Sequence, residues 1–389
     1  MELKYRLISA DSHAAFDRDA FTSRMSAKWG DRIPRVVEVE HDGCSVHRWT
    51  YYGNAPRPEG SGVCNCPALM EDRSFPHFPQ RWEEVPRAAF DPQARLEALD
   101  TDGVDAEVLF HGPDVYEFSD ADFELDFVRA ANDAMGEWTQ VSDRYLPLAQ
   151  VPWLSGAQAV AREIGRAVVD CGHRGVHLHA QTPRPLPHLG DPYWDPVWAV
   201  CQELAVPVNF HGSAGLDAGV GKREARWRGY SPRQGHSAHV TPSCVTPAQV
   251  IPHLIFSGIT ERFPNLNFVF AESGIGGLTY ALATCDHEWE SRHLWTEGIA
   301  TRPSDTVARQ IYLNFWYEAA APLLHHGGVD NIMWESDLPH IPCFYPKSRE
   351  AAERVLEGVP TADRRKLLYE NAARLYRLRL TGPAGGTPD

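Results

Sequence analysis

Short apolar runs alternate with amphipathic segments along most of the 389-residue chain. The apolar runs have the length and composition of buried strands. We expect eight strands, at residues 7–11, 106–110, 145–151, 175–179, 206–211, 266–271, 310–315 and 331–334. Between them lie amphipathic segments such as 157–171, 194–204 and 247–262, of which the last has apolar residues at helical spacing. Eight strands that alternate with helices predict an α/β fold, a (β/α)8 TIM barrel.

Two long segments interrupt the alternation. Residues 14–95 follow the first strand, and residues 212–246 follow the fifth. Because both start at carboxyl ends of barrel strands, where active sites lie, we expect a lid or oligomer arm and an active-site loop, respectively. Asp42-Gly43 between two alternating runs predicts a hairpin within the first segment. Residues 1–380 are expected to form one domain, and the Gly- and Pro-rich residues 381–389 a flexible tail.

Composition narrows the partners and the compartment. The formal net charge of −15 opposes binding to nucleic acid and to anionic membranes, although a cation in a cleft can still attract a small anionic substrate. The chain begins without the apolar run of a signal peptide, and no apolar run is long enough to span a membrane. Of the eight cysteines only Cys64 and Cys66 lie close together, and their spacing is too short for the usual zinc pair, which favours free thiols. We expect a cytoplasmic protein that acts on a small molecule, as a homodimer or higher homo-oligomer.

Acids and histidines end four of the predicted strands. The first strand ends in Asp11-Ser12-His13, the fifth in His211, the sixth in Glu272 and the eighth in Asp337. Each residue alone has an ordinary explanation, such as a helix N-cap for an aspartate or a hydrogen-bonded core histidine. Their joint position at one rim favours a shared divalent metal. Two acids and two histidines suit zinc, iron or manganese, with a position left for water.

Three further residues lie near these strand ends. His179, on the fourth strand, either packs inside the barrel or contacts substrate. Glu335 is expected to be buried behind Asp337, where it could orient another ligand. His340 follows a proline and could contact substrate or cap its loop.

The chain resembles the amidohydrolase superfamily, in the branch that also contains ACMS-decarboxylase-like enzymes. The resemblance runs from about residue 7 to about residue 375 and rests on short motifs in a specific order. The motifs are Asp11-Ser12-His13 and residues 94–106, 192–198, 207–211, 261–266, 270–276 and 335–340. The resemblance implies a distorted (β/α)8 barrel with one divalent metal. By position, Asp11 and His13 match the first-strand ligand pair, His211 the fifth-strand ligand and Asp337 the eighth-strand acid.

The chain departs from the superfamily at two of these positions. The first strand has Asp-x-His where many members have His-x-His, although a carboxylate occurs there in some decarboxylase-like members. The sixth strand ends in Glu272, where many members carry a histidine that polarises the substrate carbonyl. Glu272 could instead bind the metal, act as a general base, or be held protonated by neighbouring carboxylates.

Two reactions fit these residues. The first expectation is hydrolysis of an amide, ester or lactone of a small aromatic substrate by water activated on the metal, which we expect to be zinc, with manganese or iron as alternatives. Asp337 or Glu272 would accept the water proton. The alternative is non-oxidative decarboxylation of an aromatic or unsaturated carboxylic acid, in which Asp337 protonates the carbon. A catalytically altered barrel is a third interpretation, because Glu272 replaces the usual histidine.

Overall fold

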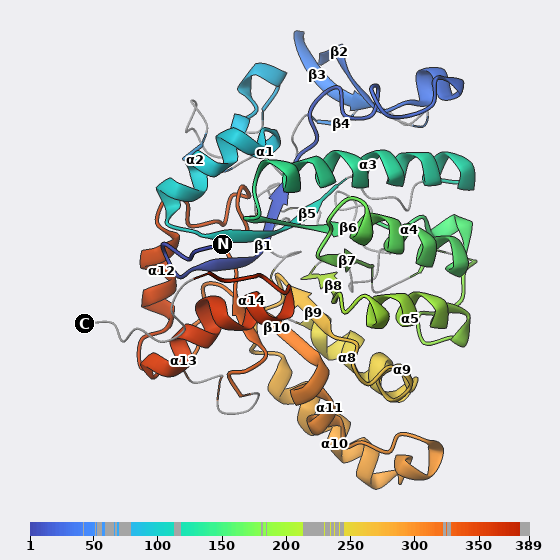
Figure 1. Ribbon diagram of the computed structural model, residues 1–389, viewed down its shortest axis with the longest axis vertical. Helices are drawn as coiled ribbons and strands as arrows, with labels where there is room; N and C mark the ends of the chain where they lie inside the picture. Colours follow the sequence, from blue (N-terminus) through green and yellow to red (C-terminus); the bar gives the residue numbers. More distant parts are fainter. Residues whose placement is uncertain are drawn as a thin grey trace.

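Eight parallel strands form the centre of the computed structural model, in the order β1-β5-β6-β7-β8-β9-β10-β11 (Figure 1). They are β1 (Ile8–Ala14), β5 (Ala106–His111), β6 (Tyr145–Ala149), β7 (Gly175–His177), β8 (Val208–His211), β9 (Phe268–Ala271), β10 (Ile311–Phe315) and β11 (Ile332–Trp334). The structure describes residues 1–41, 43–50, 52, 57–58, 66, 68–69, 79–112, 118–179, 182–183, 185–212, 229, 234, 237, 241, 245–321, 324 and 328–381. All eight predicted strands are present, and the predicted (β/α)8 barrel is confirmed.

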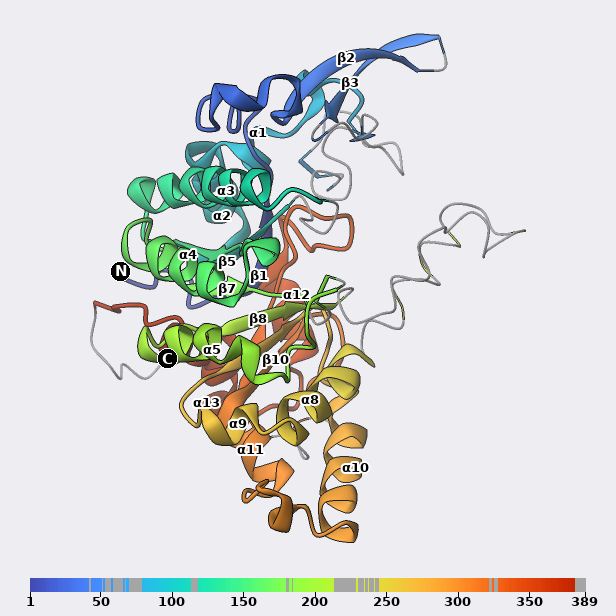
Figure 2. The ribbon, with the colours of Figure 1, turned by 90° about the vertical axis from the view of Figure 1, so that its right-hand side faces the viewer.

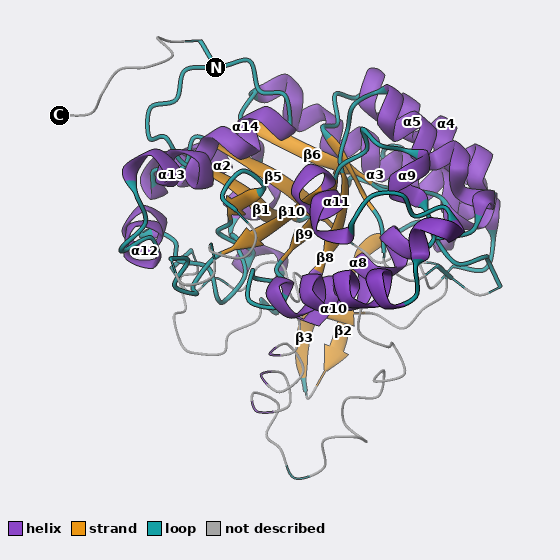
Figure 3. Ribbon diagram, turned by 90° about the horizontal axis from the view of Figure 1, so that it is seen from below, coloured by secondary structure: helices purple, strands orange, loops and turns teal. Residues whose placement is uncertain are grey.

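Helices surround these strands on the outside (Figure 3). They are α1 (Arg87–Phe90), α2 (Pro92–Asp102), α3 (Ala121–Val141), α4 (Ala157–Val169), α5 (Asp195–Glu203), α8 (Thr246–Phe256), α9 (Ile259–Arg262), α10 (Leu278–Ser291), α11 (Pro303–Gln310), α12 (Ser348–Val355), α13 (Thr361–Arg365) and α14 (Asn371–Leu375). Local sequence sets their ends, as α2 illustrates. The Asp91 side chain accepts the N–H groups of Gln93 and Ala94, and Gly103 ends the helix with a φ of 73°.

Alternate residues of the strands face two apolar layers. Ile8, Ala106, Val108 and Leu146 belong to the layer inside the barrel. Leu109, the neighbour of Val108, belongs instead to the layer between the strands and the helices. Because successive side chains point to opposite sides of a strand, the polar residues that interrupt the inner layer at the strand ends gather at the mouth of the barrel.

The predicted hairpin in the insertion is confirmed. Strands β2 (Arg35–His41) and β3 (Cys44–Thr50) pair antiparallel, with His41 opposite Cys44, and β4 (Arg57–Pro58) adds a third strand. This small sheet stands away from the barrel (Figure 2). Its role as a lid or oligomer arm stays a prediction. Most of the predicted active-site loop at 212–246 lies outside the described residues, as do residues 382–389 of the predicted tail.

The sequence predicts free thiols and no apolar run long enough to span a membrane. The cysteines within the described ranges, among them the buried Cys66, Cys201 and Cys285, are free thiols. Of the helices that the structure describes, none combines the length and the apolar character that crossing a bilayer would require.

A buried carboxylate on α3 makes the stability of the barrel sensitive to pH. Glu124 is fully buried, and one of its oxygens accepts the N–H of Leu154 over 2.7 Å. Burial raises the pKa of Glu124 to about 8. Because this folded-state pKa exceeds the ordinary value for an unfolded chain, the protonated carboxyl favours folding at low pH, and that contribution is lost as the pH rises through about 8.

Glu124→Gln is therefore expected to remove this loss, since an amide can accept the same N–H without ionising. Its unfolding temperature should exceed that of the wild type by a few degrees near pH ~9 and match it near pH ~4. Thermal unfolding followed by circular dichroism across this range measures the difference. Glu137→Gln, at an exposed position of the same helix, is the matched control. Parallel pH profiles for the wild type and Glu124→Gln would contradict the prediction.

Candidate metal centre

The carboxyl ends of four strands bring acids and histidines together. Asp11 and His13 lie on β1, His211 ends β8, Glu272 follows β9, and Asp337 comes shortly after β11. The register of β1 against β5 shifts between Ser9 and Ser12, so the regular pairing is interrupted at Ala10 and Asp11. Asp11 and Asp337 have no exposed surface, and only 8% of His13 is exposed. The structure thus collects every metal-ligand candidate of the sequence in one buried cluster.

His13 Nε2 is the atom around which the other candidates gather. It lies 3.2 Å from His211 Nε2, 3.5 Å from Asp11 Oδ1 and 3.3 Å from Asp337 Oδ1. His211 Nε2 is also 3.6 Å from Asp11 Oδ2. Two donor atoms that each lie about 2.1 Å from one ion are roughly 3.0 to 3.4 Å apart in octahedral or tetrahedral geometry. The spacing of these atoms is therefore close to that of a coordination shell.

Unsatisfied oxygens support the same interpretation. Both carboxylate oxygens of Asp11 and Oδ2 of Asp337 are buried and have no hydrogen-bond partner among the residues that the structure describes. A buried carboxylate oxygen without a partner is costly, and a divalent cation is a partner that suits it. The donor set of two carboxylates and two imidazoles thus fits a divalent metal.

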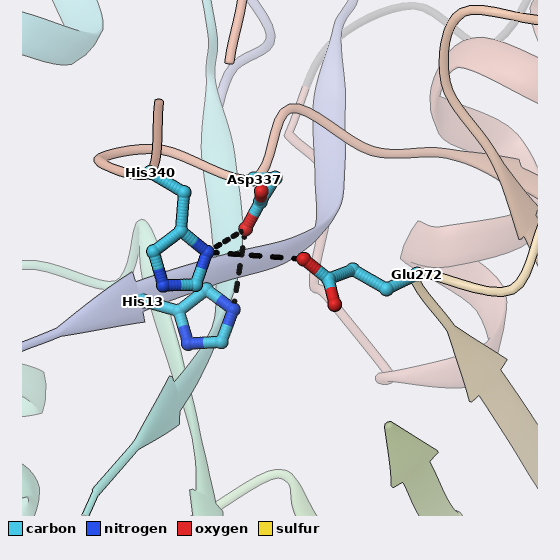
Figure 4. Close-up of side chains that lie close together, drawn as sticks. All are labelled: His13, Glu272, Asp337 and His340. Atoms are coloured by element: carbon cyan, nitrogen blue, oxygen red, sulfur yellow. Dashed lines mark hydrogen bonds and ion pairs between the residues drawn. The ribbon is translucent and has the colours of Figure 1, made fainter. Parts of the chain in front are cut away.

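His340 and Glu272 complete the other side of the cluster. His340 Nδ1 lies 2.5 Å from Asp337 Oδ1 and 3.8 Å from Glu272 Oε1, and Glu272 Oε2 lies 3.4 Å from His211 Nδ1. Figure 4 shows His13, Glu272, Asp337 and His340 pointing toward one another. Potential ligand atoms of these four residues lie within 4.8 Å of one another, and so do those of Asp11, His13 and His211. His340 therefore lies against Asp337. From the sequence, His340 was expected either to contact substrate or to cap its loop.

The backbone holds two of these acids in an uncommon conformation. The φ angles of Glu272 and Asp337 are 49° and 60°, in the left-handed region that residues other than glycine seldom adopt. Such conformations concentrate at functional sites, where surrounding contacts enforce them. One contact is visible at Glu272, whose N–H donates to Glu335 Oε2 over 3.1 Å. The buried Glu335 thus contacts the main chain of Glu272. This hydrogen bond is one way in which Glu335 could orient a ligand, as expected from the sequence.

The buried acids raise one another's pKa. Burial, then the charges of Glu335, Asp337 and Glu272, raise the pKa of Asp11 well above its usual value. Burial also raises the pKa of Glu335 well above its usual value and that of Asp337 to about 7. Metal ions bind deprotonated ligands, so a divalent cation would displace protons from this cluster.

Glu272 differs from its neighbours. Burial favours its protonated form, but His211 and His340 outweigh burial and lower the pKa of Glu272 to about 2. Burial opposes protonation of His340, but Asp337 and Glu272 outweigh it and raise the pKa of His340 to about 10. Glu272 is therefore an ionised carboxylate beside a protonated imidazole. Of the three roles considered from the sequence, a protonated Glu272 loses support, and metal ligand or general base remain.

Aromatic rings line the wall beside His13 and His211. The ring of Phe110, at the end of β5, lies 5.9 Å from that of His13, 5.1 Å from that of His211 and 5.1 Å from that of His177. The ring of the half-buried His179 lies 5.0 Å from that of His177 at an angle of 40°, and its contact with substrate stays a prediction. No role for Phe110 was expected from the sequence, although its spacing of two residues from the inward-facing Val108 is the signal that places it at the mouth.

Known proteins resemble the chain over most of its length. A family model described as amidohydrolase matches residues 43–378. The chain is 24% identical to 2-amino-3-carboxymuconate-6-semialdehyde decarboxylase of Dictyostelium discoideum over 232 residues, which span 59% of this chain and 59% of that relative.

Solved structures share the fold. An amidohydrolase from Mycobacterium avium subsp. paratuberculosis K-10 superposes with a TM-score of 0.75 at 20% identity, over 96% of this chain and 100% of the other. A dihydroxybenzoic acid decarboxylase from Polaromonas sp. JS666, with bound manganese and an inhibitor, superposes with a TM-score of 0.62 at 18% identity, over 96% of this chain and 97% of the other.

Proposed function

The chain belongs to the amidohydrolase family, and from this premise we propose that it is a metal-dependent decarboxylase of a small aromatic or unsaturated carboxylic acid. The observation that carries the proposal is the position of the buried Asp337 within the cluster of candidate ligands, where its Oδ1 lies 3.3 Å from His13 Nε2 and 2.5 Å from His340 Nδ1. A carboxyl group placed between two imidazoles and a candidate metal site can pass a proton to a substrate held there. Decarboxylases among the relatives also favour this reaction over hydrolysis.

Asp11, His13, His211 and Asp337 are proposed to hold one divalent ion. When bound, the ion would hold the substrate carboxylate and a neighbouring oxygen, and would stabilise negative charge there. Carboxylates and imidazoles together accept either zinc or manganese. The manganese in the Polaromonas decarboxylase makes that metal a candidate here beside zinc, which the sequence favoured.

Asp337 is proposed to deliver a proton to the carbon that bears the substrate carboxylate. The O–H bond of Asp337 breaks as the new C–H bond forms. The C–C bond to the carboxylate then breaks, and the carboxylate leaves as carbon dioxide. Solvent returns a proton to Asp337. A hydrogen bond between His340 Nδ1 and Asp337 Oδ1 fixes the carboxyl group, and Glu272 Oε1 lies 3.8 Å from the same imidazole nitrogen. The ring of Phe110, which lies beside His13 and His211, could pack against an aromatic substrate.

Hydrolysis is the second candidate, because Glu272 is an ionised carboxylate that could accept a proton from water. For this reaction Glu272 and Asp337 would share the movement of protons between water and the leaving group. The metal-ligand candidates would be the same in both reactions, so products rather than geometry distinguish them.

The products are expected to show decarboxylation. Protein loaded with manganese or zinc is incubated with a panel of hydroxybenzoates and unsaturated dicarboxylates that carry an isotope-labelled carboxyl group. We expect labelled carbon dioxide, one deuterium on the product carbon when the solvent is deuterium oxide, and no heavy oxygen in the product when the water is enriched in it. Mass spectrometry measures all three. Heavy oxygen in the product of an ester, amide or lactone panel, with no carbon dioxide from the acids, would favour hydrolysis instead.

A further inference from the structure

Three of the four candidate ligands, Asp11, His13 and Asp337, lie on the two sides of a seam in the barrel. The seam is the junction between β1 and the segment Glu335–Leu338 that follows β11. Strand pairing runs from β1 through β5 round to β11, and the pairings of the described strands include none between β11 and β1. Asp11 and His13 belong to one side and Asp337 to the other. The distance between them therefore depends on contacts other than a regular ladder.

Isolated hydrogen bonds close the seam. The Asp337 N–H donates to the Asp11 carbonyl over 3.0 Å, and the His13 N–H donates to the Leu338 carbonyl over 2.7 Å. The Ser336 N–H also donates to Ser9 Oγ over 2.9 Å. Each bond joins a residue of β1 to the segment that carries Asp337, so the seam and the candidate metal centre are built from the same stretch of backbone.

A fully buried arginine from outside the barrel reaches this seam. Arg95, on α2, and Glu107, on β5, have no exposed surface. Arg95 Nε and Nη2 donate to the two Glu107 oxygens over 2.9 and 2.7 Å, and Nη1 donates to the Ala88 carbonyl over 3.2 Å. Arg95 Nη2 also donates to the Leu338 carbonyl over 3.0 Å. The Leu338 carbonyl thus accepts from both Arg95 and His13.

We propose that Arg95 is a positioning residue, which holds the Leu338 carbonyl so that Asp337 is fixed opposite Asp11 and His13. Leu338 directly follows Asp337, and a carbonyl anchored at Leu338 restricts the rotation of the intervening peptide. This restraint explains how Asp337 keeps its left-handed backbone conformation, with a φ of 60°. Arg95 acts through the main chain and contacts none of the candidate ligand side chains among its hydrogen bonds in the described structure.

Glu107 supplies the counter-charge that the buried guanidinium of Arg95 needs. A buried guanidinium without a counter-charge would be costly, and the two-pronged contact with Glu107 fixes its plane as well as its charge. Nε and Nη2 donate to Glu107 and Nη1 donates to Ala88, so the second N–H of Nη2 remains to donate to the Leu338 carbonyl. A lysine has a single ammonium group on a flexible stem and cannot reproduce this fork. The geometry, and not the charge alone, is therefore the property to be tested.

The test compares the metal-free wild type with Arg95→Met/Glu107→Met, which removes both charges together. Replacing both partners of a buried pair with apolar residues of similar volume usually preserves folding, whereas replacing one leaves a buried charge. Hydrogen–deuterium exchange of peptides covering residues 335–338 and His13 is measured by mass spectrometry. We expect exchange there to accelerate by about tenfold or more, while β6 and β7 keep their protection. Unchanged exchange in the folded double variant would overturn the proposal.

Arg95→Lys gives a second route if the double variant does not fold. It keeps a positive charge beside Glu107, and we expect faster exchange at residues 335–338 here as well. Arg144→Met is the matched control: Arg144 donates to the carbonyls of Asp105 and Val104, at the opposite end of β5 from the site. Exchange at the seam should stay unchanged in this control. If Arg144→Met accelerates exchange at the seam as much as the other variants do, the effect is general loosening and the proposal fails.

The consequence for the candidate metal centre rests on the proposed function and has its own measurement. Competition with a chelator should show manganese or zinc bound about 10- to 100-fold more weakly by the double variant than by the wild type, the usual effect of removing a group that orients a ligand. Equal affinity in a folded double variant would overturn the link between Arg95 and the site. A wild type that binds neither metal would contradict the proposed function, while the exchange experiment would still decide the role of Arg95.

Discussion

Asp337→Asn is expected to lower turnover by on the order of 10³-fold or more while the protein keeps its fold. Asparagine has nearly the shape of aspartate but carries no exchangeable acid proton, so it cannot protonate the substrate carbon. It also removes one negative charge from the candidate ligands. The left-handed backbone at this position, with a φ of 60°, is a conformation that asparagine tolerates better than most residues. The side-chain carbonyl can still accept the hydrogen bond from His340.

Steady-state rates with the acid that the product assay identifies as substrate measure the loss, and circular dichroism and thermal unfolding check the fold. Asp105→Asn is the matched control, because Asp105 is a buried carboxylate before β5, where it accepts the N–H groups of Lys4, Tyr5 and Leu7. That variant should lose some stability and keep its turnover number. Turnover by Asp337→Asn within tenfold of the wild type would sink the assignment of Asp337 as the proton donor.

The strand ends that carry the site could be predicted from the sequence because they obey a local rule. Asp11, His211 and Asp337 each follow an apolar strand, and the carboxyl ends of all strands of a parallel barrel meet at one mouth. The strand pattern therefore placed residues that are far apart in the chain next to one another. The same rule also placed Glu272 in the cluster, although it could not say whether that carboxyl is ionised.

What the sequence did not predict depends on contacts between distant segments. The pKa of Glu272 is set by His211 and His340, whose positions relative to it follow only from the folded loops. Arg95 stood in a motif without an assigned role, since nothing in the pattern indicates that its guanidinium meets the Leu338 carbonyl, 243 residues away in the chain. Side-chain hydrogen bonds of this kind have no sequence period.

Removal of the metal is expected to abolish turnover and to lower stability in a pH-dependent way. In the metal-free protein, burial and mutual repulsion raise the pKa values of Asp11, Glu335 and Asp337, that of Asp337 to about 7. Carboxyls with raised pKa values in the folded state contribute stability at low pH and lose it as the pH rises through those values. A divalent cation takes the place of the lost protons. The stability that the metal adds should therefore be small near pH ~5 and larger near pH ~8.

Thermal unfolding of chelator-treated protein, with and without an excess of manganese or zinc, measures this gain at both pH values. At a free metal concentration about 1,000 times the dissociation constant, binding adds on the order of 4 kcal/mol to the free energy of unfolding. Turnover should return with the same metal concentration that restores stability. His211→Ala, which removes one candidate ligand from β8, should reduce both effects. Because protons and the cation compete for the same carboxylates, an equal thermal shift at the two pH values would show that the metal binds elsewhere, and full turnover by metal-free protein would rule out the proposed centre.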